Sequence, residues 1–438
     1  MRYYLSFANK LIGDEKRYEN LIMMGLAVFI GVVTGTAAIA FNKMVDITRH
    51  LFFDQLFSTS NISIRLRLFF IPILGGATIG IINRFFLDKK DEGFGVSRVL
   101  EELRYINKFL MKPKIVLIKI LQTIITLGSG LSAGRQGPTV HLGGAIGATI
   151  GYKFNFSKTK LRILIGCGVS GAIAGVFNAP IAASVFVLEV LMSKEHLEYF
   201  APIVISSITS VIIARVLIGN SAFFVIEGNF GLVSYRELVL YVGLGILIGV
   251  FAVFYMKLID YIKKNIARIR INSVFYPVVG ALGVAFIGYF LPEIFDIKYG
   301  TIKEIVEGSY ELRLLIFLSL GKMLATALTL GSGGVGGVFV PGIFIGATVG
   351  SIYGNIAEIM QLKIFNVNTY ALVGMGAMIA AFANAPLTGS IILFELTDNY
   401  TIILPILLSC AVGSVTTQLI FQKTIYNMSL DDIEDKKQ

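Results

Sequence analysis

The chain has 438 residues, of which 55% are hydrophobic and only 15% are charged, and its mean hydropathy is +0.76. Soluble domains carry about 25% charged residues, so this composition excludes an ordinary soluble enzyme. The net charge of +10 comes from basic residues in short connectors, such as those around Lys263 and Arg268, which is typical of cytoplasmic loops and argues against nucleic-acid binding.

Residues 1–19 precede the first apolar run and mix aromatic with charged side chains, so a cytoplasmic or interfacial helix is predicted there. The first run is too long for the core of a signal peptide and lacks a small-residue cleavage site, so it is predicted to be retained. Several runs reach the roughly 20 residues that span a bilayer. These runs are 20–42, 163–188, 271–292, 323–357, 364–394 and 399–422. The predicted fold class is therefore an all-α polytopic membrane protein.

The chain repeats itself. Residues 119–151 align without a gap with residues 322–354 at an offset of 203, and thirteen of the 33 pairs are identical. At an offset of 206, Asn-Ala-Pro at 178–180 recurs at 384–386, and Glu189 matches Glu395. Shared membrane composition would not keep Lys, Pro and Asn in register, so we infer an internal duplication. The predicted divisions are 20–218 for the first membrane repeat, 219–237 for a connector, 238–428 for the second repeat and 429–438 for a charged tail.

Gly-rich turns stand at equivalent places in the two repeats, at 134–138 and 336–341, and a third lies at 93–96. A helix that begins at such a turn leaves several backbone N–H groups without intrahelical partners. The helix dipole adds partial positive charge there, so the turn attracts anions without a formal charge. Glycines in membrane helices also serve close packing. From the residues alone, both readings stay open.

The segments Gly134-Arg135-Gln136-Gly137-Pro138, Gly336 to Pro341, Asn178-Ala179-Pro180 and the ending from Leu396 to Tyr426 resemble the signature segments of the CLC chloride channel and transporter family. The resemblance covers about residues 20 to 428. It implies two inverted-topology repeats of tilted, partly discontinuous helices and a homodimer with one pore per subunit. It also implies transport of chloride or a similar monovalent anion across a lipid bilayer, with no cofactor and no metal. We expect a bacterial inner membrane, with both termini cytoplasmic.

The resemblance implies an anion site, residue by residue. The backbone N–H groups of Val338 and Phe339 and the hydroxyl of Tyr426 would contact a central anion. The amides around Arg135 and Gly137 would form an outer site. Lys119 matches a buried basic residue that raises the positive potential of the pore; the alternative is a lysine that extends to the membrane interface.

The inner loop departs from the family pattern. The family reads Gly-Ser-Gly-Ile-Pro, whereas this chain reads Gly93-Phe94-Gly95-Val96-Ser97. An aromatic ring therefore replaces the serine hydroxyl that would contact the anion. Phe94 could present its positive ring edge to an anion, narrow the pore as an apolar gate, or serve packing alone. The sequence does not choose among these, although Gly93, Phe94 and Gly95 remain candidate site residues.

Two further departures concern protons. The gating glutamate of the family is Gln136 here, and glutamine cannot titrate. The internal proton-transfer glutamate of the family aligns with Val190. Its neighbour Glu189 is retained, but the match to Glu395 favours a structural role. His141 corresponds to Phe344 in the other repeat and is interpreted as a packing or hydrogen-bonded histidine.

Together these replacements predict passive, uncoupled anion transport. Three different functions stay open: an anion/proton antiporter with altered coupling, a preference for another anion such as fluoride or nitrate, and a non-conducting membrane sensor or structural protein. A membrane-embedded enzyme is not expected, because ionisable residues within the apolar runs are isolated rather than clustered.

Overall fold

The computed structural model describes residues 2–55, 64–87, 94–106, 111–192, 200–219, 230–295, 300–397 and 399–428; within these, the side chains of 2–18, 54, 55 and 64 are outside the description. The described residues are almost entirely helical and contain no strand beyond one isolated bridge. Nine of the described helices are long and apolar enough to cross a membrane. The all-α membrane fold predicted from hydropathy is confirmed.

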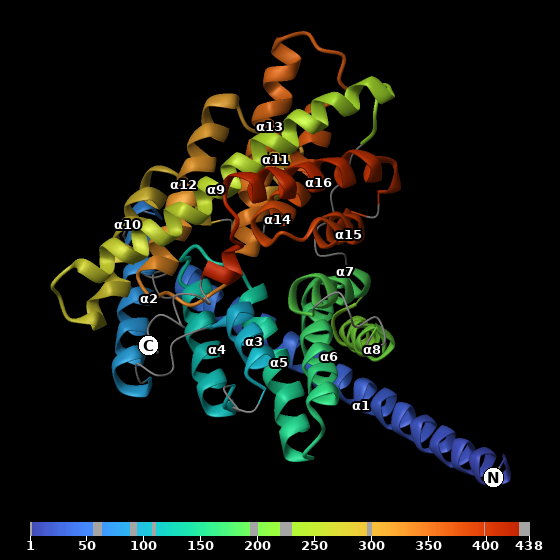
Figure 1. Cartoon of the computed structure of the whole chain (residues 1–438). Helices are drawn as coiled ribbons and strands as arrows, with labels where there is room; N and C mark the ends of the chain where they lie inside the picture. The colour runs from blue at the N-terminus through green and yellow to red at the C-terminus, as the bar shows by residue number, and fades with distance from the viewer. Residues whose placement is uncertain are drawn as a thin grey trace.

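The first half of the chain contains α1 (Arg2–His50), α2 (Ile64–Phe86), α3 (Gly95–Arg104), α4 (Pro113–Gly128), α5 (Gln136–Lys153), α6 (Lys158–Phe177), α7 (Pro180–Phe186) and α8 (Phe200–Ile218). The second half contains α9 (Leu238–Arg268), α10 (Tyr276–Phe290), α11 (Gly300–Val306), α12 (Leu312–Gly331), α13 (Phe339–Ile359), α14 (Val367–Ala383), α15 (Pro386–Thr397) and α16 (Ile403–Ile420). A π-helical turn, Val187–Leu191, extends α7, and a 3-10 turn, Pro292–Phe295, follows α10. Figure 1 shows the two halves one above the other, with the start of α1 projecting from the body.

The two halves are related by reciprocal contacts. Gly134 N–H donates to the carbonyl of Gly337 at 2.6 Å, and Gly337 N–H donates back to Gly134 at 2.8 Å, in an antiparallel bridge. Gly134 and Gly337 occupy equivalent positions in the two repeats, so each repeat contributes the same residue to the bridge. Reciprocal contact between equivalent residues is the signature of a two-fold axis. An antiparallel pairing at that axis makes the two repeats run in opposite directions, and Figure 1 shows α5 and α13 leaving it oppositely.

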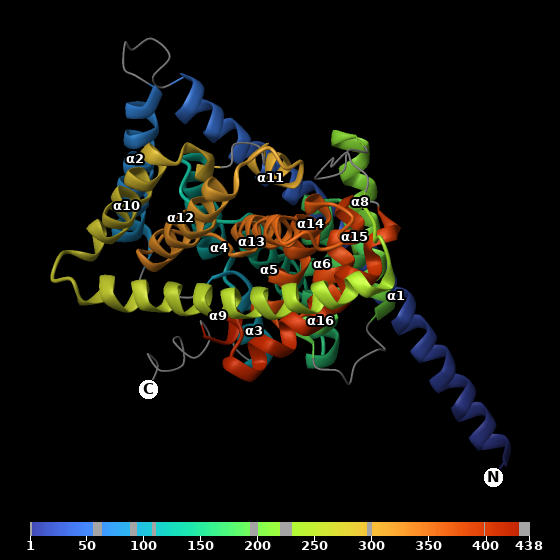
Figure 2. The same ribbon diagram turned by 90° about the horizontal axis from the view of Figure 1, so that it is seen from above.

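Helix packing follows the same symmetry. α5 packs on α6 and α13 packs on α14, with equivalent glycines at both crossings. A Cβ at Gly143 would lie 2.1 Å from the carbonyl of Gly168, and one at Gly346 would lie 2.3 Å from that of Gly374. Only glycine permits so close an approach. Figure 2 shows these inner helices surrounded by longer ones, including α9, which crosses the body beside α16.

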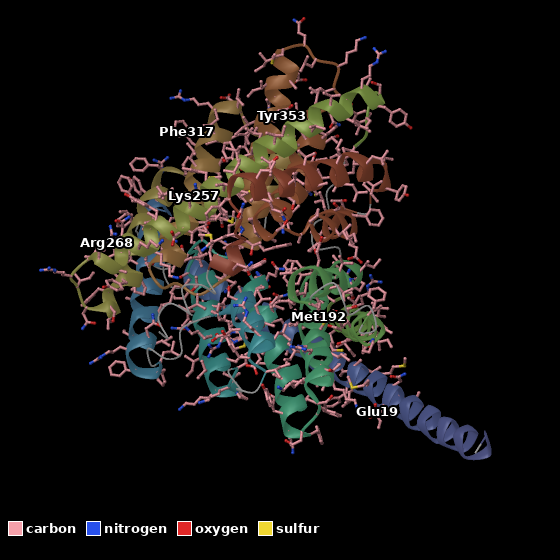
Figure 3. The ribbon with its side chains drawn as sticks, in the orientation of Figure 1. Glu19, Met192, Lys257, Arg268, Phe317 and Tyr353 are labelled. Carbon is pink, nitrogen blue, oxygen red and sulfur yellow. The ribbon has the colours of Figure 1, made fainter. Side chains whose placement is uncertain are left out.

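Asparagines end the equivalent helices α6 and α14. Asn178 and Asn384 both adopt the left-handed conformation, with φ of 56° and 54°, and proline begins the next helix two residues later in each case. Asparagine tolerates this conformation better than other side chains, and proline suits a helix start. The apolar run 163–188 is consequently two helices. Outside this buried centre, apolar side chains such as Phe317 lie on the periphery, and Arg268 lies at the far end of α9 (Figure 3).

Candidate anion site

Three helix starts, those of α3, α5 and α13, meet at a set of glycines. A Cβ at Gly337 would lie 2.7 Å from the amide nitrogen of Gly137, and one at Gly95 would lie 3.3 Å from the Cα of Gly137. Gly95 also has a φ of +68°, which a side chain would strain. The three backbones approach so closely because these positions lack side chains. Their positive dipole ends therefore share one small region.

The first amides of α5 and α13 precede the intrahelical hydrogen bonds. In α5 the first such bond runs from Thr139 N–H to the carbonyl of Arg135, and in α13 it runs from Gly342 N–H to the carbonyl of Val338. The N–H groups before these donors have no intrahelical acceptor. Proline stands third in both helices, at Pro138 and Pro341, where the absence of an N–H costs no hydrogen bond. Each start therefore offers a short row of backbone donors.

The side chain of Gln136 lies within this region. It is the first residue of α5, only 2% of its surface is exposed, and its Nε2 has no hydrogen-bond partner. A buried amide donor without a partner costs free energy, which an acceptor at this place would recover. Phe339 is buried beside the second start, with its ring centroid 5.6 Å from that of Phe177. Val338 is half-buried and caps α13 through its backbone.

Tyr426 lies near the start of α3. Its backbone carbonyl accepts a 3.0 Å hydrogen bond from the hydroxyl of Ser97, which belongs to the first turn of that helix. The tyrosine is buried, and its ring meets Phe186 edge-on at 6.4 Å. The structure thus brings together Tyr426 and the start of α3, which are more than 300 positions apart in the chain. Gly93, the remaining residue expected here, lies outside the described residues.

Phe94 precedes α3 in an extended conformation and makes no side-chain cap. Its ring meets the imidazole of His141 edge-to-face at 5.1 Å. His141 is buried on α5, and its Nδ1 has no hydrogen-bond partner. The interpretation of His141 as a packing or hydrogen-bonded histidine did not include this contact with the Phe94 ring. No spacing signal in the sequence points to it, because Phe94 lies before α3 and His141 lies on α5.

Glu189 and Val190 lie on the π-helical turn after α7. The carboxylate of Glu189 accepts hydrogen bonds from the N–H groups of Leu387 and Thr388, at 3.0 and 2.7 Å, and from the Thr388 hydroxyl at 2.6 Å. These are first-turn donors of α15 in the other repeat. Glu189 therefore caps a helix, and Val190 is a half-buried apolar neighbour.

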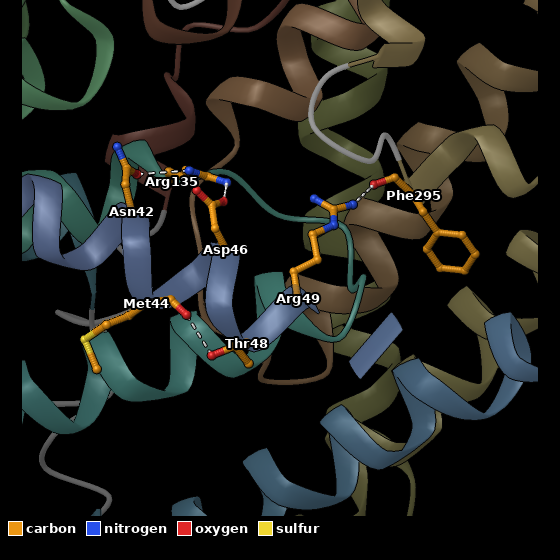
Figure 4. A network of polar contacts seen from close by, with 7 residues as sticks. All are labelled: Asn42, Met44, Asp46, Thr48, Arg49, Arg135 and Phe295. Carbon is orange, nitrogen blue, oxygen red and sulfur yellow. Dashed lines mark hydrogen bonds and ion pairs between the residues drawn. The ribbon is translucent and has the colours of Figure 1, made fainter. Parts of the chain in front are cut away.

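Cationic side chains flank the same region. Arg135 precedes α5. Its 2.8 Å ion pair with Asp46 and its 3.1 Å hydrogen bond to Asn42 tie it to α1 (Figure 4). Lys119 is half-buried on α4. Lys322, its equivalent in the second repeat, is more deeply buried. Among the described residues, no group of three His, Cys, Asp or Glu side chains is arranged to hold a metal ion.

The sequence profile of the family described as "Voltage gated chloride channel" matches residues 75–418. A curated relative from Ralstonia nicotianae, named a putative chloride channel protein ClcB-like, is 30% identical over 82% of this chain and 84% of its own length. An H(+)/Cl(-) exchange transporter ClcA from Vibrio campbellii is 28% identical over 96% of this chain and 92% of its own.

Solved structures share the fold. A slow cyanobacterial Cl-/H+ antiporter superposes with a TM-score of 0.80 and 24% identity, covering 95% of this chain and 99% of its own. A CLC-type fluoride/proton antiporter superposes with a TM-score of 0.75 and 20% identity, covering 94% of this chain and 98% of its own. At these identities the likeness concerns the arrangement of helices.

Proposed function

We propose that this chain, which belongs to the voltage-gated chloride channel family, conducts chloride or a similar monovalent anion passively. Membership of that family means that the protein moves anions across a membrane. Protons are not exchanged in return. The observation that carries this proposal is Gln136, a buried amide at the meeting point of the helix starts with an unpartnered Nε2. An amide can donate to a passing anion, but it cannot take up and release a proton at physiological pH.

The second acid position supports the same proposal. Val190 has no ionisable group, and the carboxylate beside it, on Glu189, is occupied by three hydrogen bonds from α15. These hydrogen bonds commit the Glu189 carboxylate to capping α15. Neither position therefore offers an uncommitted acid side chain for a proton relay.

In this proposal the anion contacts backbone and side-chain donors in sequence. The N–H groups of Val338 and Phe339 and the hydroxyl of Tyr426 hold it centrally, and the amides around Arg135, Gln136 and Gly137 hold it at an outer position. Phe94 and Gly95 border the central position. Dipolar donors suit conduction because they bind an anion firmly enough for entry and weakly enough for exit.

The remaining features of the protein are proposed from the family resemblance. They are a homodimer with one pore per subunit, a bacterial inner membrane and cytoplasmic termini. The proposed repeats, 20–218 and 238–428, are separated by the connector 219–237; α8 ends at Ile218 and α9 begins at Leu238, which supports these bounds. The segments 1–19 and 429–438 flank the repeats, although α1 continues through residue 19 without a break.

Parallel flux measurements test the proposal. The purified protein is reconstituted in liposomes with a chloride gradient, the voltage is set by potassium and valinomycin, and chloride and proton movement are recorded together. We expect chloride flux above that of empty liposomes and no proton movement against its gradient. Uphill proton movement driven by chloride would show an antiporter, as the name of the Vibrio relative states for that protein.

The same liposomes test which anion is carried and whether the protein conducts at all. Replacing chloride by nitrate or fluoride at equal concentration ranks the anions, and faster fluoride flux would replace the chloride assignment. Flux no faster than in empty liposomes, from protein that is folded by its thermal unfolding curve, would point to a non-conducting sensor or structural protein.

A further inference from the structure

A cavity opens where the connection between α5 and α6 reaches the surface, at the lower edge of the body in Figure 1. Its volume is about 250 Å³, and its wall includes Tyr152, Asn155 and Lys158 together with Ile106, which follows α3. One water molecule needs roughly 10–15 Å³ on the same measure, so this cavity has room for a group of many atoms. Asn155 and Lys158 are exposed, so the cavity is open to the outside.

Positive charge is concentrated on this connection. Residues 151–162 contain four cationic residues and no acidic one. The equivalent stretch of the second repeat, residues 354–368, contains one lysine and one glutamate, whose charges cancel. Both connections turn through a left-handed residue, Asn155 with a φ of 52° and Gln361 with a φ of 54°. The same turn therefore forms without the four cations, and the fold alone does not explain them.

The first turn of α6 carries the opposite charge to the one that stabilises a helix start. Lys158 and Lys160 are its first and third residues, and the turn contains no acidic residue. The positive end of the helix dipole lies at the same place, so cations there lower the stability of the helix. A 2.8 Å ion pair with Glu19 of α1 compensates Lys160. Lys158 lines the cavity, so its charge and the helix dipole both favour an anion at that wall.

The cavity lies beside the point at which α1 enters the apolar layer of the membrane. The segment of α1 that is apolar enough to span the membrane begins at Glu19, the partner of Lys160. Leu21 and Ile22, which follow it, are 57% and 56% exposed. On the connection itself, Phe154 is 61% exposed among the cationic residues. Exposed apolar side chains next to basic ones are typical of the level of the lipid headgroups, so we expect the cavity at that level.

We propose that this cavity binds the headgroup of an anionic phospholipid, with Lys158 at the phosphate and with Lys153 and Arg162 adding to the attraction. Lysine is a common phosphate ligand as a point charge, and clusters of cations next to a membrane span attract anionic lipids. The lipid belongs to the leaflet on the N-terminal side of α1, which is the cytoplasmic one if the termini are cytoplasmic. This binding goes beyond anion conduction and does not depend on it.

A lipid here would also brace two helices that begin at the candidate anion site. The hydroxyl of Tyr152, near the end of α5, lies 2.7 Å from the carboxylate of Glu102 and 2.6 Å from the carbonyl of Ile106. Glu102 belongs to α3 and Ile106 to the turn after it. The far ends of α3 and α5 are therefore joined at the cavity wall. A ligand that binds only the folded protein stabilises it, so lipid binding should raise the unfolding temperature.

Lipid titration of the full-length protein in an uncharged detergent tests the site. The probes are a short-chain phosphatidylglycerol, the phosphatidylcholine with the same acyl chains, and glycerol phosphate. The readouts are the lipid retained in native mass spectrometry and the unfolding temperature. We expect saturable binding of the phosphatidylglycerol alone, which Lys158→Gln weakens by about 5-fold, because one cation at the headgroup is lost, and which Lys158→Arg retains. Added salt should weaken this binding, since exposed charges are screened.

Arg268→Gln is the matched control, because it removes an exposed cation at the far end of α9 that does not line the cavity. It should leave lipid binding unchanged; a loss equal to that of Lys158→Gln would mean general charge attraction and would overturn the site. Equal binding of the phosphatidylcholine would assign the binding to acyl chains, and equal binding of glycerol phosphate would assign it to soluble phosphates; either result would overturn the lipid assignment. Lys153→Gln, which should also weaken binding, replaces Lys158→Gln if that variant does not fold.

Discussion

Gln136 stands at the start of α5, where the proposed anion path passes, and its amide cannot titrate. Its side chain is buried at the first position of α5, so a glutamate there would face the anion. An ionised carboxylate competes with the anion, whereas a protonated one does not. We expect Gln136→Glu to make flux fall by about 10-fold or more as pH rises from about 4 to about 8, measured as chloride efflux from liposomes, whereas flux through the unaltered protein stays nearly constant.

The control for this prediction is Gln361→Glu, the same change at an exposed residue beyond α13. It should leave the pH profile flat. A flat profile for Gln136→Glu would mean that the side chain at this position does not reach the anion path.

Phe94 is the side chain that the loop before α3 would present to the anion in the proposed path. It contacts His141 through its ring and makes no cap at the helix start. We expect Phe94→Ser to tighten the apparent binding of chloride by about 3- to 10-fold, because a hydroxyl bonded to an ion contributes more than an apolar ring edge. Isothermal titration of chloride into the detergent-solubilised protein measures this.

Phe94→Leu separates the hydroxyl from the loss of the ring, because it removes the aromatic contact with His141 without adding a donor. Its chloride affinity should stay close to that of the unaltered protein. Equal tightening in both variants would assign the effect to ring size and identify Phe94 as an apolar constriction.

The residue types alone predicted only part of the candidate site. The Gly-rich turns predicted helix starts with backbone donors, and α5 and α13 begin at Gln136 and Phe339. The contact of Phe94 with His141 could not be predicted. It joins a residue before α3 to one on α5, and no periodicity within one helix indicates such a contact.

At the scale of helices, the equivalent glutamates exchange caps across the two-fold axis. Glu395 accepts from the N–H groups of Ile181 and Ala182 in α7, at 2.9 and 2.7 Å, as Glu189 accepts from α15. We expect Glu189→Gln and Glu395→Gln each to lower the free energy of unfolding by about 1–3 kcal/mol, because each weakens at least two charged hydrogen bonds at a helix start. Chemical denaturation in detergent micelles measures this loss.

Glu358→Gln, an exposed change near the end of α13, should leave stability unaltered. A capping role also requires similar losses at Glu189 and Glu395. If Glu189→Gln instead changed proton movement in the liposome assay and left stability intact, Glu189 would be a proton carrier.

The duplication was predicted from sequence because Lys, Pro and Asn stay in register between the repeats. The apolar run 163–188 does not show where its helix ends, since hydropathy is insensitive to one left-handed residue; the break at Asn178 depends on backbone conformation. The reciprocal capping was equally hidden. An offset of 206 relates Glu189 to Glu395, but only the two-fold axis places each beside the other's helix.

At the scale of the whole molecule, one chain supplies every described part of the candidate path. Gly134 and Gly337 pair within the chain, and Tyr426 contacts the start of α3 through Ser97. We therefore expect the path to lie within a subunit, so that a homodimer would contain two independent paths. Heterodimers of the unaltered protein and Gln136→Glu, isolated with two different affinity tags, should pass about half the chloride of the unaltered dimer at pH values where the glutamate is ionised.

This half-flux follows because an ionised glutamate competes only within its own subunit. A path shared at the interface would be blocked by either copy, so the heterodimer would then conduct almost nothing. Light scattering from the detergent-solubilised protein establishes first that two copies associate; a monomeric particle that conducts in liposomes at low protein density would contradict the dimer while leaving the path within one chain. Equal flux per subunit in all three pairings at low pH, where the glutamate is protonated, shows that the variant subunits are folded and active.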